Sequence, residues 1–419
     1  MTLLRWTVGV WIVLFFTFLP FPLEYFPDFG TYLSALFLPL TKAVSGFPDE
    51  VLQKTYGFSD SIHLYIQTIA LLVISIPIAF FCEKSKYKDR LQSYLTVGVS
   101  FIMGFFLLKY GIEKLTRLQF PSPEANILYT PSGQLDKDIL FWTTMGTSTV
   151  YAWFMGIVEI FCAFLLFIPK TRFIAALTSV GIFVNIFAIN IGFDITVKLL
   201  AFALLSASLF LVTPNLLRLT QFLIGKPAKP ISSCRIQYNN EILHRILKGT
   251  AIAFIIIECC IPVFGRLNPP IGNTSLGSYE VLSIEGDAEK LVDGDVRRVH
   301  LHRDGYFIIE SNKGVFTSHR GTKASSSQSF SFNDNSKIHI AHDDSLWFFE
   351  SQVETEINLT CKKLNNALLP PLKDNFHWTV ERMIETKYFP HFYSYSCLLL
   401  PYTTLFNMPG FHLSSTAFS

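Results

Sequence analysis

The sequence predicts an α-helical membrane bundle joined to a small antiparallel all-β domain that lies outside the membrane. Of the 419 residues, 50% are hydrophobic and only 16% are charged, whereas an ordinary soluble domain is about one quarter charged. The charged residues are sparse before about residue 270 and dense after it. Long apolar segments fill the first part, and short β-forming runs separated by turn residues fill the second.

Seven apolar segments are long enough to cross a bilayer, because about 20 helical residues span its hydrocarbon core. The first segment lacks a small-residue cleavage site, so we interpret it as a retained helix and not as a signal peptide. We expect the helices near residues 4–21, 61–82, 91–112, 148–168, 172–191, 196–216 and 246–265.

The charges of the connecting segments predict the orientation of these helices. Lys and Arg concentrate in the segments 83–90, 169–172 and 225–248, whereas the loops at 22–60 and 117–147 hold proportionately more acid. The positive-inside bias therefore places the N-terminus in the cytoplasm. Because the number of spans is odd, everything that follows the last span is expected outside.

The β-rich part begins near Ser278 and contains eight short runs of β-forming residues up to Leu364. Turn signals such as Asp304-Gly305 separate the runs, which favours an antiparallel meander in a small sandwich or barrel. We expect its core to contain Phe330, Phe332, Trp347 and Phe348.

Histidines and cysteines in this part offer little chemistry. His300 and His302 have a spacing that metal ligands use, but no Cys or carboxylate completes a recognisable site, so we interpret them as solvated strand histidines and predict no metal. Cys361 and Cys397 would meet an oxidising compartment and could form a disulfide. The adjacent Cys259 and Cys260 are interpreted as small packing residues of the last helix.

Ionisable residues inside the spans are the strongest functional signal, because such residues usually face the bundle interior, a partner or water. Glu159 lies midway along its helix, where a carboxylate costs about 2.5–3.5 kcal/mol even on the milder insertion scales. Most of the other polar residues fall in the outer half of the membrane on the third to sixth helices. We expect one ligand pocket, open to the outer face, that is lined by Lys109, Glu113, Glu159, Asn185, Asn190, Asp194 and Lys198.

Asp194 and Lys198 also have a structural interpretation. Asp194 is placed to cap the sixth helix, and Lys198 near that helix N-terminus needs a negative partner, either Asp194 or Glu113. The pair could instead only hold the hairpin while Lys198 extends toward water. For Glu159, the structural alternative is a buried hydrogen bond.

Residues 91 to about 225 resemble the DoxX family of bacterial membrane proteins. The matching pieces are KYGIEKL followed by QFPSP, then FMGIVEIFCAFLLFIP, KTRFIAAL and NIFAINIGFDITVKLLAF. The resemblance implies a four-helix membrane core in the inner membrane of a Gram-negative bacterium, so that the outside is the periplasm. Some members are linked to quinone-coupled sulfur oxidation or to oxidative-stress complexes, and the family offers no settled catalytic residues to carry over.

Together these observations predict five consecutive parts. They are two N-terminal transmembrane helices with an outer loop (1–90), the DoxX-like four-helix core (91–225), a cytoplasmic loop with the seventh helix (226–270), the β-rich periplasmic domain (271–381) and an irregular tail (382–419).

Two classes of function follow. In the first, the protein is a redox-associated membrane subunit whose pocket binds a quinone or another small ligand. The sequence shows no haem-ligand pair, CxxC motif or nucleotide loop, so a partner would supply the electron carrier. In the second, it is a non-enzymatic scaffold or small-solute carrier whose β domain binds a periplasmic partner. A more distant alternative is the vitamin K-dependent carboxylase-like group, which uses intramembrane Lys chemistry. The expected partners are membrane lipid and a periplasmic or membrane protein; no basic patch indicates nucleic acid.

Overall fold

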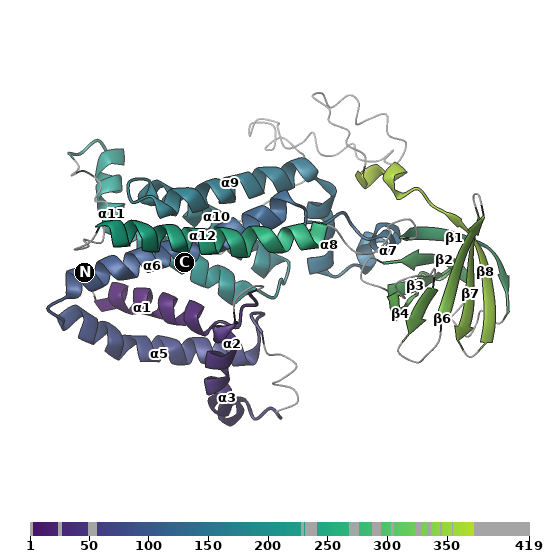
Figure 1. Cartoon of the computed structure of the whole chain (residues 1–419), viewed down its shortest axis with the longest axis horizontal. Coiled ribbons are helices and arrows are strands. Elements are labelled where there is room, and N and C mark those ends of the chain that lie inside the picture. Colours follow the sequence, from purple (N-terminus) through teal and green to yellow (C-terminus); the bar gives the residue numbers. More distant parts are fainter. Residues whose placement is uncertain are drawn as a thin grey trace, which may run out of the picture. The chain divides into compact units, whose positions relative to one another are not determined.

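The computed structural model shows a helical bundle and a β-barrel (Figure 1). It describes residues 3–23, 27–48, 57–227, 230, 241–267, 276–286, 295–302, 306–323, 329–332, 337–343, 346–353 and 355–372.

Five helices of the described chain are long and apolar enough to span a bilayer, which marks the protein as a membrane protein. Each coincides with a span predicted from the sequence, so five of the seven predicted segments are helices that could cross a membrane. They are α5 (Ile62–Lys84), α6 (Lys88–Leu115), α9 (Thr149–Phe167), α10 (Arg172–Gly192) and α11 (Lys198–Leu223).

The other two predicted spans are helices that pack in the same bundle. The helix α1 (Leu3–Phe18) is apolar but has only 16 residues. The helix α12 (Glu241–Leu267) has 27 residues, but several side chains at its two ends lie outside the described residues. Both contribute to the core of the bundle, α1 through Phe15 and α12 through Ile255. The described part of the chain therefore does not establish these two helices as spans.

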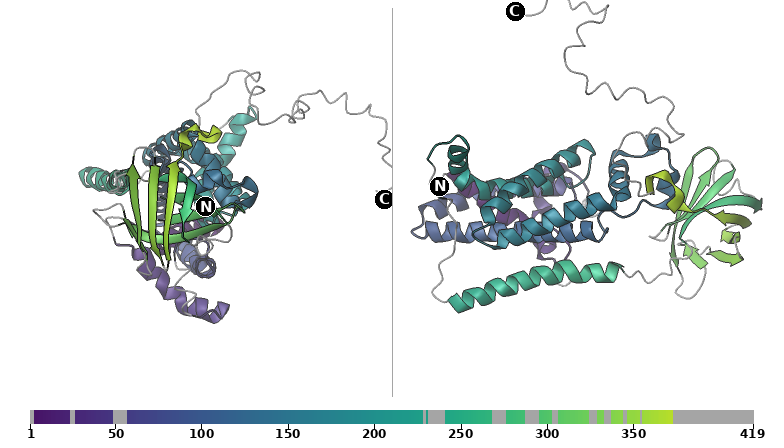
Figure 2. Two further views of the ribbon diagram at one scale, coloured as in Figure 1. Left: turned by 90° about the vertical axis from the view of Figure 1, so that its right-hand side faces the viewer. Right: turned by 90° about the horizontal axis from the view of Figure 1, so that it is seen from above.

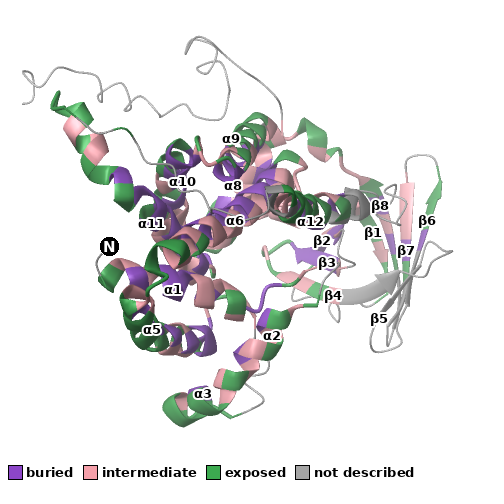
Figure 3. Ribbon diagram, turned by 60° about the vertical axis from the view of Figure 1, so that its left-hand side comes forward, coloured by how far each residue is buried: buried purple, intermediate pink, exposed green. Residues whose placement is uncertain are grey.

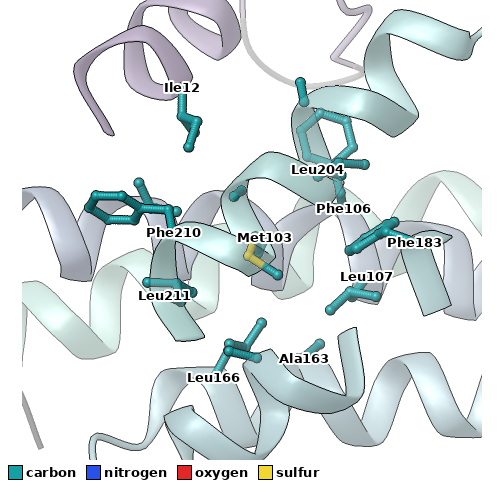
Figure 4. Packing of buried hydrophobic residues seen from close by; sticks show 14 of the residues in the cluster. Ile12, Met103, Phe106, Leu107, Ala163, Leu166, Phe183, Leu204, Phe210 and Leu211 are labelled. Carbon is teal, nitrogen blue, oxygen red and sulfur yellow. The ribbon is translucent and has the colours of Figure 1, made fainter. Parts of the chain in front are cut away.

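Buried hydrophobic residues around α6, such as Met103 and Leu107, form the bundle core (Figure 4). The ribbon of α5 and α9 is coloured as exposed along much of the outer side of the bundle (Figure 3). The α6 and α9 backbones approach closely at two glycines. A Cβ atom on Gly111 would lie 2.9 Å from the Gly156 carbonyl oxygen, and one on Gly156 would lie 2.6 Å from that of Gly111. Small residues permit such close approach in membrane bundles. This contact sets the register in which α6 and α9 face each other.

Short helices occupy the two segments that the sequence analysis treats as loops. Asp28 begins the first of them, because its side chain accepts a hydrogen bond from the Thr31 N–H at 3.1 Å. These helices are α2 (Phe29–Ser34), the 3₁₀ turn η1 (Ala35–Phe37), α3 (Leu38–Ser45), α7 (Ala125–Tyr129), the turn η2 (Ser132–Gln134) and α8 (Lys137–Thr147).

The β-rich part is a closed antiparallel barrel (Figure 2), which confirms the predicted meander. Each strand pairs with the next, and the last pairs with the first, with Tyr279 opposite Lys363. The strands are β1 (Gly277–Glu285), β2 (Val296–Leu301), β3 (Tyr306–Ser311), β4 (Phe316–Lys323), β5 (Ser329–Phe332), β6 (Lys337–Asp343), β7 (Leu346–Val353) and β8 (Thr355–Lys363).

The barrel core differs in part from the prediction. Phe349 is buried at 1% exposure, and Trp347 packs against the same cluster, because side chains two apart on a strand share a face. Phe348 points to the opposite face, so its predicted place in the core was wrong. The side chains of Phe330 and Phe332 lie outside the described residues.

A second compact unit begins at Ala367. Its described part contains the end of the 3₁₀ turn η5 (Asn366–Leu368) and the turn η6 (Pro370–Leu372). The predicted irregular tail, residues 382–419, lies outside the described residues.

Candidate functional site

A cavity of about 400 Å³ lies at the end of the bundle where α6 ends and α9 begins. Pockets for small molecules range from about 300 to 1,000 Å³, so it has room for a ligand of ring size. Its walls come from α6, α8, α9, α10 and α11 and from the connecting segments at 58–59, 119–120 and 195–197. Aromatic and methionine side chains are prominent, namely Phe58, Phe106, Tyr110, Phe120, Phe141, Trp142, Met145, Tyr151, Met155 and Phe183.

A buried ion pair lies in the wall of this cavity. The Lys114 Nζ atom is 2.9 Å from Glu159 Oε1 and 2.7 Å from Oε2. Lys114 is 4% exposed and Glu159 is 1% exposed. Charges so far from water are tolerated only when paired and hydrogen-bonded. Glu159 therefore does have a buried partner, and that partner, Lys114, lies beyond the end of the span expected near residues 91–112.

A signal for Lys114 was present in the sequence. Gly104, Leu107, Gly111 and Lys114 are spaced three, four and three residues apart, which puts them on one face of α6. Because Gly111 contacts the α9 backbone at Gly156, the next residue on that face is directed toward α9. Reading this glycine-bearing face would have indicated that Lys114 points into the bundle.

Lys109 and Glu113, both predicted for the pocket, form an i,i+4 ion pair on α6, with 3.3 Å between Lys109 Nζ and Glu113 Oε1. Their side chains are 12% and 15% exposed. Glu113 lines the cavity, but Lys109 does not. The ammonium group of Lys109 instead lies 5.8 Å from the centre of the Phe21 ring.

Asn185 and Asn190 both line the cavity, as predicted. Asn190 is 4% exposed, and its side-chain Nδ2 donates to the Val197 carbonyl oxygen at 3.2 Å. Its own carbonyl accepts from the Ile195 N–H at 3.0 Å. Asn190 therefore closes the turn between α10 and α11 and positions the cavity wall at 195–197.

Lys198 and Asp194 form the predicted hairpin pair, at 2.8 Å between Nζ and Oδ1, but neither lines the cavity. Of the seven predicted pocket residues, all of which the structure describes, four line the cavity and Lys109, Asp194 and Lys198 do not. Of the two partners considered for Lys198, the structure pairs it with Asp194, whereas Glu113 pairs with Lys109 within α6.

The predicted cap was wrong as well. Asp60 caps α11, since its carboxylate accepts from the backbone N–H groups of Lys198 and Leu199 at 2.8 and 3.0 Å. Asp194 has a left-handed backbone conformation, with φ of 54°, and an 83% exposed side chain. The hydrogen bond from Lys198, followed by its charge, holds the pKa of Asp194 below its ordinary value.

The helix α8 and the segment before it cover one side of the cavity with aromatic rings. Phe120, Phe141 and Trp142 pack together, with Phe120 and Trp142 ring centres 5.6 Å apart. Arg117 holds this segment: its Nε donates to the Phe120 carbonyl at 2.8 Å, and its other nitrogens donate to Gly146 O and Thr149 Oγ1. This wall lies within residues 117–147, which were expected from the sequence to form an outer loop.

The barrel contains a second buried polar cluster. His300 is 1% exposed, with Nδ1 2.9 Å from Ser278 Oγ and Nε2 3.2 Å from Glu310 Oε2. Arg298 donates to both Glu310 oxygens at 2.8 and 3.0 Å. The Tyr129 ring of α7 lies 4.4 Å from the Arg298 guanidinium carbon. The interpretation of His300 as a solvated histidine was therefore wrong.

Burial and hydrogen bonding shift the pKa values of His300 and Glu310 in this cluster. Removal from water lowers the pKa of His300, and hydrogen bonding to Glu310 opposes that shift only in part. Burial pushes the pKa of Glu310 up, but the hydrogen bonds from His300 and Arg298 outweigh burial and leave that pKa below its ordinary value. The satisfied and covered groups are typical of a structural network that holds α7 on the barrel.

Metal and thiol chemistry receive no support from the described residues. Within those ranges, no group of three or more His, Cys, Asp or Glu side chains is placed to hold a metal ion. Cys361 lies buried in the barrel core, and burial raises the pKa of its thiol to about 12. Cys397 lies outside the described residues, so the disulfide stays a prediction.

The fold and the cavity define a class of protein, a helical membrane protein with a ligand-sized cavity in its bundle and an attached β-barrel. No family model matches the chain, and no solved structure matches it. A stretch of 110 residues, 26% of the chain, is 44% identical to the uncharacterized protein YwoB of Bacillus subtilis (strain 168) and covers 70% of that protein. The chain belongs to the same family as this relative, whose name assigns no activity.

Proposed function

We propose that this protein binds a neutral, apolar molecule of ring size, such as a quinone, in the cavity beside Lys114 and Glu159, and that it serves as a redox-associated membrane subunit of DoxX-like type. The observation that supports this most is the combination of aromatic walls with one buried, charge-balanced ion pair. Ligand pockets typically join apolar walls to a few placed polar groups in this way.

The charge balance of the site favours a neutral ligand. Lys114 and Glu159 neutralise each other, and Glu113 is neutralised by Lys109. An anionic or cationic ligand would leave one buried charge in excess, which is costly in a poorly hydrated site. A ring carbonyl could accept a hydrogen bond from Lys114, and a ring hydroxyl could donate one to Glu159, while the aromatic rings stack on the ligand.

The same proposal includes seven spans, a cytoplasmic N-terminus and a periplasmic barrel. The basic connectors 83–90 and 169–172 follow α5 and α9, at the ends of these helices away from the cavity. By the positive-inside bias, the cavity then lies toward the outer face. A reporter enzyme fused after residue 270 should be active only outside the cytoplasm, and cytoplasmic activity would contradict this orientation.

Quinone binding can be measured through Trp142, which lines the cavity. The full-length protein in mild detergent is titrated with decylubiquinone, whose ring quenches nearby tryptophan fluorescence. We expect saturable quenching that is largely lost in Trp142→Phe. The matched control is Trp153→Phe, which removes a 48% exposed tryptophan on the outside of α9 and should keep the saturable signal.

Two results would contradict the proposal. Equal loss of quenching in the two variants would place the quinone in the detergent shell, and absence of saturation would exclude this ring as a ligand. In either case the alternative function, a non-enzymatic scaffold or solute carrier whose barrel binds a periplasmic partner, becomes the better account. Mass spectrometry of gently extracted protein then identifies any other retained small molecule.

A further inference from the structure

The short helices between α1 and α5 carry apolar side chains on their exposed side and polar side chains on their buried side. This is the reverse of a helix on the surface of a water-soluble protein. The large exposed side chains of this segment are apolar, and from Phe29 to Val44 they recur every three or four residues, as expected for one helical face. Tyr32 is 73% exposed, Leu36 70% and Val44 65%. This outer stripe consists of Phe29, Tyr32, Leu36, Leu40, Val44 and Phe47.

Two polar side chains of the same helices point inward. Ser34 and Thr41 are fully buried, and they bond to the two ring nitrogens of the buried His63 on α5. The distances are 2.9 Å from Ser34 Oγ to Nε2 and 2.8 Å from Thr41 Oγ1 to Nδ1. Gln67, one turn further along α5, bonds to Ser34 and donates to the Phe18 carbonyl at 2.9 Å.

A close backbone contact fixes the start of this segment. A Cβ atom on Gly30 would lie 1.8 Å from the carbonyl oxygen of Leu19, just past the end of α1. Together with the bonds to His63, this contact leaves the helices no freedom to rotate their polar side outward. The outer stripe is thus a fixed feature of the fold.

The direction of the segment matches a position at a membrane boundary. In Figures 1 and 2, α2 and α3 run across α5 and not along it. The bonds to His63 and Gln67 place them beside the first turns of α5. The outer side of α5 continues the apolar surface, with Ile69 62% exposed and Val73 60% exposed.

We propose that the outer stripe is immersed in lipid, so that α2, η1 and α3 form an interfacial helix that lies in the plane of the bilayer boundary. The inference rests on the apolar outer side of these helices, because apolar side chains are stable on a surface that faces lipid. Lys42 is the one charged residue between Phe29 and Phe47, and a lysine at this depth can extend its ammonium group to the headgroups. The inference does not depend on the ligand of the cavity.

The test attaches a nitroxide to single introduced cysteines in the full-length protein, reconstituted in phosphatidylethanolamine–phosphatidylglycerol vesicles. The background chain has its seven native cysteines replaced by serine or alanine. The probes are Leu36→Cys and Val44→Cys on the outer stripe, Ser132→Cys as an exposed polar control, and Thr41→Cys as a buried control. Collisions with oxygen report lipid, and collisions with a water-soluble nickel chelate report water.

We expect both stripe probes to show an oxygen-to-nickel accessibility ratio several-fold above that of Ser132→Cys. Nickel accessibility equal to that of the Ser132 probe would overturn the proposal, because the stripe would then face water. Low accessibility to both reagents, as at Thr41, would also overturn it, because a second copy or another protein would then cover the stripe. The two stripe probes are independent, so misfolding of one variant leaves the other to decide.

Discussion

Removing one partner of the Lys114–Glu159 pair should destabilise the protein far more than removing both. Both side chains are at most 5% exposed, and both carboxylate oxygens lie within 2.9 Å of the ammonium nitrogen. Glu159→Gln leaves a buried ammonium without a counter-charge, and Lys114→Met leaves a buried carboxylate. Breaking a buried pair in this way typically costs about 3–5 kcal/mol.

The double variant Lys114→Met/Glu159→Met leaves no buried charge. Replacing a whole buried pair by apolar side chains of similar volume is often neutral or stabilising. We therefore expect the double variant to lie within about 1 kcal/mol of the wild type, so that the two substitutions are strongly non-additive. Unfolding of purified protein in mixed micelles, followed by tryptophan fluorescence, measures all four corners of the cycle.

A matched control is Lys109→Met, which removes the lysine of the more exposed pair on the same helix. It should cost clearly less than Lys114→Met. The reasoning would be refuted if each single variant at the buried pair cost less than about 1 kcal/mol, or if the double variant cost the sum of the two.

Three further outcomes are expected. Asp60→Ala should cost about 1 kcal/mol in unfolding experiments through loss of the α11 cap, whereas Asp194→Ala should have the smaller effect because its carboxylate is exposed. Gly146→Ala should lower stability and ligand binding, because its Cβ would lie 2.2 Å from the Pro121 carbonyl oxygen. The control Gly133→Ala should be neutral, because its Cβ would meet nothing within 4 Å. Equal effects of the two variants would contradict this geometry. Because the pKa of His300 is lowered from 6.5 by burial, the unfolded state binds the proton more readily and the barrel should lose stability as pH falls below about 6.5 toward the folded pKa. Protection factors of the β1–β3 amides, corrected for the intrinsic exchange rate at each pH, should show this loss between pH 7.5 and 5, and His300→Gln should remove most of it.

The sequence by itself determined the long apolar helices and the strands of the barrel. Runs of about 20 apolar residues predicted α5, α6, α9, α10 and α11, because only a helix satisfies its backbone within lipid. The β-forming runs between turn signals predicted every strand of the barrel. Short elements such as α3 and α8 were missed, because helices of 8 and 11 residues are too short to be recognised as spans and lie within segments expected to be loops.

Only the tertiary structure decided which charges meet. Lys114 and Glu159 are 45 positions apart, and Asp60 and Lys198 are 138 apart. Neighbour spacing on one helix predicts pairs such as Lys198 with Asp194, but it carries no information about pairs between helices. Those pairs depend on how the helices are rotated and shifted against each other. Here the backbone contact between Gly111 and Gly156 sets that register, and it turns Lys114, not Lys198, toward Glu159.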